Sequence, residues 1–211
     1  DLGPHKRLGL QTPELAYARA GTAWHRAAPG TALIENGPEG AWDAGNLQPA
    51  SQPVYLDDEI RYYYAGTDVR HSPSWEMEPQ RAGLSMASLK PDRFVAMRAA
   101  DEPADLSTVI FELPSADVFV NAHVVPDGEM RAELLDAEAR PIPGFTINDC
   151  RPVTGDATSH RLAWSGAGQA AAPVGRPARL RVTARNASLY SIFVTEPDET
   201  PVYHRFAALW P

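Results

Sequence analysis

The chain has 211 residues with a formal net charge of -8, and it contains 20 prolines, 15 glycines and a single cysteine, Cys150. This number of chain-breaking residues disfavours a helical bundle and is typical of an all-β protein with many turns. The negative charge argues against a nucleic-acid partner and against an anionic membrane surface. No apolar run approaches the roughly 18 residues of a membrane-spanning helix. One cysteine excludes an internal disulfide and a cysteine-cluster metal site.

The first hundred residues predict short strands separated by turns. On the strand that begins at Glu59, Ile60, Tyr62 and Tyr64 share one face, and Tyr63 lies on the other. Alternating side chains and turn signals predict strands at 15–19, 24–26, 52–56, 59–65, 83–89 and 94–98.

The pattern changes after residue 100. The stretch 100–105 is polar and rich in breakers, which indicates a boundary between a first unit, 1–100, and a second unit, 101–211. Turn signals such as Pro126-Asp127-Gly128 and Asn186-Ala187 separate the later strands, a spacing typical of an antiparallel β-sandwich. These strands are expected at 108–113, 118–125, 129–136, 160–164, 178–184 and 188–195.

Two parts of the chain resemble a known family. The segment 15–26, LAYARAGTAWHR, resembles the edge of a blade in five-bladed β-propeller glycosidases, the group that hydrolyses sucrose, fructans and arabinans. The stretch 40–66, with GAWDAGN, QPVY and DEIRYYYAG, resembles the next blade, and 81–98 resembles its outer strands. Residues 101–211 are similar to the β-sandwich that often follows such propellers.

This resemblance implies a protein that acts on the glycosidic bond of a carbohydrate, without a cofactor except for a central divalent ion such as calcium in some members. Five blades of four strands need roughly 250–300 residues, whereas the first unit suffices for about one and a half blades. We therefore expect the main catalytic carboxylates upstream of this chain. We also expect a missing N-terminal portion, or a second chain, to complete the propeller and to cover its open edge strands.

Four side chains are candidates for sugar binding: Asp43, His71, Trp75 and Trp42. Asp43 opens the expected inner strand, where it could bind a sugar or tune a neighbouring carboxyl group; the alternative is a turn cap. His71 follows the second strand of the hairpin. Because the two strands run antiparallel, we expect His71 at the same rim as Asp43, sharing a ligand or a proton with it. The alternative is an exposed loop histidine.

The remaining features have plainer interpretations. Trp75 lies in a polar loop and could stack on a sugar, whereas aromatic residues such as Trp42 and Tyr64 also suit core packing. The acidic run 57–59 predicts a hairpin turn rather than a calcium site, because three consecutive side chains cannot all point one way. Cys150 is expected to be a buried structural thiol.

Two other functions compete with the glycosidase hypothesis. One is a non-catalytic carbohydrate-binding or adhesion module in which the sandwich binds the sugar. The other is a structural all-β domain without a small-molecule ligand.

Overall fold

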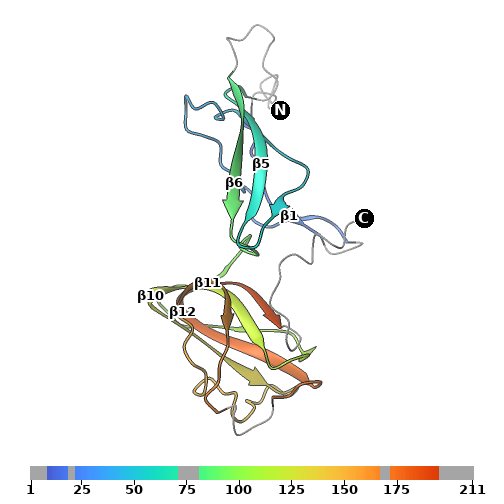
Figure 1. Ribbon diagram of the computed structural model, residues 1–211, viewed down its shortest axis with the longest axis vertical. Coiled ribbons are helices and arrows are strands. Elements are labelled where there is room, and N and C mark those ends of the chain that lie inside the picture. Colours follow the sequence, from blue (N-terminus) through green and yellow to red (C-terminus); the bar gives the residue numbers. More distant parts are fainter. Residues whose placement is uncertain (1–8, 19–21, 71–80, 167–171, 195–211) are drawn as a thin grey trace, which may run out of the picture. The chain divides into compact units, whose positions relative to one another are not determined.

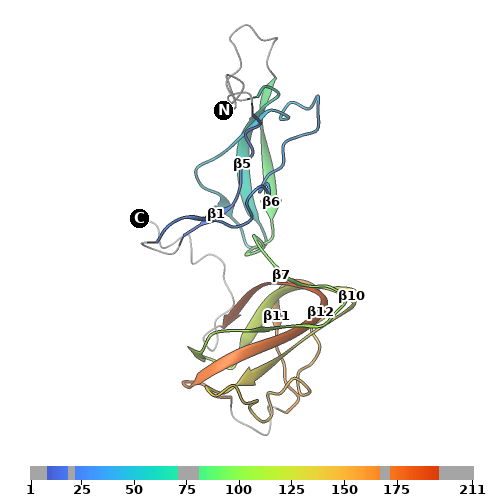
Figure 2. The ribbon, with the colours of Figure 1, turned by 180° about the vertical axis from the view of Figure 1, so that it is seen from behind.

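The computed structural model describes residues 9–18, 22–70, 81–166 and 172–194, and in these ranges the chain is all-β, with antiparallel sheets and no helix. None of these sheets closes on itself within the described ranges. The part of the chain described here contains no helix long and apolar enough to cross a membrane. The chain divides between Lys90 and Pro91 into two compact units, which Figures 1 and 2 show from opposite sides.

The first unit contains a small sheet built around β5 (Ile60–Thr67). β3 (Asn46–Pro49) and β4 (Val54–Tyr55) pair with different parts of β5, whereas β6 (Ala82–Leu89) pairs with it along its whole length. β3 and β4 therefore share one edge of β5, and β6 occupies the other (Figure 1).

A small core lies on one face of this sheet, and a two-stranded ribbon accompanies it. The ribbon pairs β1 (Ala16–Tyr17) with β2 (His25–Arg26). The predicted alternation along β5 is confirmed, because Tyr64 is 9% exposed and faces the core whereas Tyr63 is 47% exposed. The buried members of the core are Ile34, Leu47 and Tyr64, with Leu33, Trp42, Tyr62 and Ala87 packed against them.

Two 18-residue strands, β10 (Val118–Leu135) and β12 (Pro177–Val194), form the centre of the second unit. β11 (Gly155–Arg161) pairs with the first half of β10. Three short strands line the other edge of β12: β7 (Met97–Ala99), β8 (Ala104–Ser107) and β9 (Phe111–Glu112).

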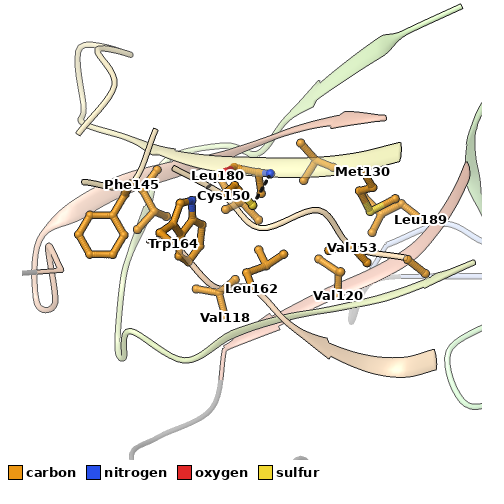
Figure 3. Close-up of a cluster of buried hydrophobic side chains, with 14 of the residues drawn as sticks. Val118, Val120, Met130, Phe145, Cys150, Val153, Leu162, Trp164, Leu180 and Leu189 are labelled. Carbon is orange, nitrogen blue, oxygen red and sulfur yellow. Dashed lines mark hydrogen bonds between the residues drawn. The ribbon is translucent and has the colours of Figure 1, made fainter. Parts of the chain in front are cut away.

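β10 and β12 together form a long two-stranded ribbon, and both halves of this long ribbon contribute to one hydrophobic core. Figure 3 shows Val118 and Val120 on one side of the cluster and Met130 and Leu180 on the other. All four side chains are completely buried. The long ribbon therefore bends over itself, so that the apolar face of one half packs against the apolar face of the other half.

The two long strands differ from the sequence prediction. The sequence predicts separate strands at 118–125 and 129–136, and again at 178–184 and 188–195. In the structure each pair is one strand with an irregular register, in which residues 125–128 of β10 stand opposite Asn186 of β12. The turn residues thus bend the ribbon and do not reverse the chain.

The structure also corrects the sequence predictions for two shorter segments, 94–98 and 100–105. The sequence predicts 94–98 as an outer strand of the first sheet, but β7 pairs with β12 of the second unit, and Ala99 is buried opposite Ala187. β8 begins within the breaker-rich stretch 100–105. It forms there because Leu106 packs against the core and the Asp105 carboxylate accepts a hydrogen bond of 2.6 Å from Thr183.

Candidate functional site

The candidate site lies at the end of the first unit's sheet where β3 begins and β5 ends. Asn46 of β3 pairs with Thr67 of β5, and the Gly45 N–H donates a hydrogen bond of 2.8 Å to the Thr67 carbonyl. The loop 42–45 therefore lies at the same end of the sheet as the segment that follows β5, beginning at residue 68. We call this end of the sheet the rim.

Asp43 is held at the rim by Tyr64. The Tyr64 hydroxyl donates a hydrogen bond of 3.1 Å to Oδ2 of Asp43. A Cβ on Gly37 would collide with the other carboxylate oxygen, and a Cβ on Gly66 would stand 2.7 Å from the Asp43 Cβ. The two glycines leave the space that the side chain occupies, so the carboxylate has a defined orientation.

Trp42 lies across the backbone of β5 and β6. Cβ atoms added to Gly66 and Gly83 would stand 2.8 and 3.1 Å from its indole ring. The indole also stacks on the Tyr64 ring, with the centroids 6.1 Å apart and the planes at 9°. Trp42 thus packs against the core, the alternative considered for it, while part of its surface remains exposed.

An ion pair closes the base of the connection between β5 and β6. Arg81 Nε donates to Oδ2 of Asp68 at 2.8 Å, and the Arg81 backbone N–H donates to Oδ1 at 3.0 Å. Arg81 Nη2 also donates to the Gly40 carbonyl at 2.8 Å, which links this base to the loop before Asp43. The hydrogen bonds from Arg81 lower the pKa of the Asp68 carboxyl, so this group is ionised near neutral pH.

Sequence reasoning missed two of these contacts. The alternation along β5 predicts that Tyr64 faces inward, but it does not reveal that its hydroxyl reaches Asp43. The Asp68–Arg81 pair has a weak signal in the sequence, because the two opposite charges lie just after the expected strand 59–65 and just before the expected strand 83–89.

His71 and Trp75 lie outside the residues that the structure describes. Among the described residues, no group of three or more His, Cys, Asp and Glu side chains could hold a metal ion. The acidic run 57–59 forms a hairpin turn, as predicted: the Leu56 N–H donates to the Glu59 carbonyl at 2.9 Å between β4 and β5.

Comparisons with models of protein families, with curated proteins and with solved structures give no match. The fold defines the class of the chain, an all-β protein whose described residues form antiparallel sheets in two compact units.

Proposed function

We propose that this chain is the C-terminal part of a glycoside-hydrolase-like protein that acts on the glycosidic bond of a carbohydrate. The first unit would end a five-bladed propeller, the second unit, which begins at Pro91, would form a β-sandwich, and the main catalytic carboxylates would lie upstream. The observation that carries the proposal is the arrangement at the rim, where Tyr64 orients the Asp43 carboxylate beside the Trp42 indole. Sugars present hydroxyl groups to carboxylates and flat C–H faces to aromatic rings, so this combination suits a sugar contact.

The first unit's sheet supports the propeller half of the proposal, because both of its faces carry apolar side chains. One face covers the small core. On the other, Tyr63 pairs with Met86 and Ala65 pairs with Leu84, and Leu84 is 86% exposed. A blade lies between two neighbouring blades and needs apolar side chains on both faces. A solvated sheet would instead carry polar residues on the outer one.

The test is an activity assay on the protein expressed from the complete reading frame that contains this chain. We expect it to hydrolyse one class among a panel of sucrose-, fructan- and arabinan-type substrates. Asp43→Asn keeps an acceptor for the Tyr64 hydroxyl but removes the charge, so it should lower kcat/KM at least about tenfold, the usual weight of a charged hydrogen bond. Its melting temperature should stay close to that of the unmodified protein.

Asp58→Asn is the matched control, because Asp58 is an exposed carboxylate in the hairpin turn. It should leave kcat/KM unchanged. The proposal fails if no glycoside is turned over, or if Asp43→Asn and Asp58→Asn have the same activity.

A second candidate function is that of a non-catalytic carbohydrate-binding module. A separate observation favours it, a pocket on the second unit lined by Arg98, His123 and Ser188. Sugar binding without turnover, retained in Asp43→Asn, would favour this function over hydrolysis.

A further inference from the structure

Three polar side chains form a row across β7, β12 and β10. Arg98 pairs with Ser188, and Ser188 pairs with His123. Directly paired residues of antiparallel strands project from the same face of the sheet. The three side chains therefore share one face, although they come from segments far apart in the sequence.

This face is the one opposite the hydrophobic core. The preceding or following residue on each strand faces inward: Ala99 is 7%, Ala187 5% and Val124 2% exposed. Since successive side chains of a strand alternate between faces, the row faces outward. Arg98 and His123 are accordingly exposed.

The row lines a pocket of about 270 Å³, together with Ala99, Val125, Asn186 and Ala187. The pocket lies beside the bend of the ribbon, where Asn186 has a positive φ of 48° and residues 125–128 bulge out of the ladder. Its volume is just below the ~300–1,000 Å³ of typical small-molecule sites. It therefore fits one sugar ring or a similar small group.

The Arg98 side chain gives the pocket a positive charge. Within the described ranges, neither the Arg98 nor the His123 side chain has a hydrogen bond or an ion pair, in contrast to Arg93, which pairs with Asp156. Two carboxylates lie near the pocket. Asp156 stands opposite His123 on β11 and forms an ion pair with Arg93, whereas Asp127 accepts a hydrogen bond of 3.4 Å from the neutral side chain of the pocket residue Asn186.

We propose that this pocket binds the carboxylate or sulfate group of an acidic sugar. The Arg98 guanidinium supplies the ionic contact and two parallel N–H donors, the arrangement that suits planar and tetrahedral oxyanions. Ser188 and His123 supply further hydrogen bonds from the neighbouring strands. The choice of a sugar rests on the proposed function, whereas the choice of an oxyanion rests only on the pocket.

The test is equilibrium binding to the full chain by titration calorimetry. Galacturonic acid and galactose 6-sulfate are the acidic probes, galactose is the neutral counterpart, and inorganic sulfate is the free oxyanion. We expect at least one acidic sugar to bind about tenfold or more tightly than galactose, and Arg98→Gln to remove that difference. Arg151→Gln is the matched control, an exposed arginine of the same unit that does not line the pocket, and it should bind like the unmodified chain.

Three results would overturn the inference. Equal affinity for acidic and neutral sugars would show that the chain does not select an anion. Unchanged binding in Arg98→Gln would show that the sugar binds outside this pocket. If inorganic sulfate binds as tightly as galactose 6-sulfate, the sugar ring contributes nothing to the affinity, and the pocket does not recognise a sugar. Failure of the proposed hydrolase function is read separately, from glycoside turnover by the protein of the complete reading frame and by its Asp43→Asn and Asp58→Asn variants, because neither residue is part of this pocket.

Discussion

Gly128 of β10 and Asn186 of β12 stand opposite each other at the point where both long strands change register. A Cβ on Gly128 would collide with the Asn186 carbonyl oxygen and would stand 2.9 Å from the Arg185 carbonyl oxygen. Asn186 itself has a φ of 48°, in the left-handed region that asparagine tolerates better than most residues. The two backbones therefore approach too closely for any side chain at position 128.

Replacing Gly128 with alanine should destabilise the second unit. The added methyl group meets two backbone carbonyls, which cannot rotate away, so the ribbon must shift at its bend. We expect a loss of about 1–3 kcal/mol in the free energy of unfolding, the usual range for overpacking. Thermal and urea denaturation measure this change.

Gly9→Ala serves as the control for Gly128→Ala, because a Cβ at Gly9 meets nothing within 4 Å. It should unfold like the unmodified chain. A Gly128→Ala variant that melts together with Gly9→Ala would show that the strands can separate at the bend at little cost.

The bend also shows where sequence reasoning succeeds and where it stops. The residues Pro126-Asp127-Gly128 and Asn186-Ala187 mark irregular backbone correctly, because proline, glycine and asparagine act locally on φ and ψ. Whether the chain reverses there depends on strand pairing between residues about sixty positions apart. Local chemistry does not contain that information, so the sequence predicts four strands where the structure has two bent ones.

At the rim, too, the sequence predicts the local relations and only the structure supplies the long-range contacts. That the Asp43 loop and the end of β5 lie at the same end of the sheet follows from the antiparallel pairing, which is a local relation. The hydrogen bond from Tyr64 and the seat of Trp42 on Gly66 and Gly83 depend on how side chains meet across strands. A sequence pattern predicts the face of a strand but not these contacts.

Cys150 should be unreactive in the folded chain. Its side chain is 2% exposed, its Sγ accepts a hydrogen bond of 3.2 Å from the Ala132 N–H, and it lies within the core shown in Figure 3. Burial raises the pKa of the thiol, which lowers the fraction of reactive thiolate. With a disulfide reagent at pH 8, we expect the folded chain to react about 100-fold or more slowly than the urea-unfolded chain.

The unfolded sample provides the internal control for this measurement, because it should release one equivalent for the single cysteine of the chain. Rapid reaction under native conditions would mean that the core opens locally around Cys150, contrary to its packing.

Acidification should weaken the first unit through Asp68. The hydrogen bonds from Arg81 hold the pKa of this carboxyl below its ordinary value of 3.8 in the folded chain. A carboxyl whose pKa is lowered by folding stabilises the folded chain above its unfolded pKa, and this contribution disappears as the pH falls through the folded pKa. Asp68→Asn removes the charge but keeps an oxygen that accepts the Arg81 backbone N–H, so it isolates the ionic part.

The free energies of unfolding of the unmodified chain and of Asp68→Asn should therefore differ most above about pH 5 and converge as the pH falls below about 4. Because Arg81 is 59% exposed, water and salt screen the pair, and the difference should shrink further in concentrated salt. Urea denaturation at a series of pH values measures it, with Asp58→Asn, in the exposed hairpin turn, as the control for loss of a surface charge. A difference between the unmodified chain and Asp68→Asn that stays constant from pH 7 to pH 2.5 would show that the ion pair does not stabilise the fold. In that case the backbone hydrogen bond alone would close the base of the connection between β5 and β6.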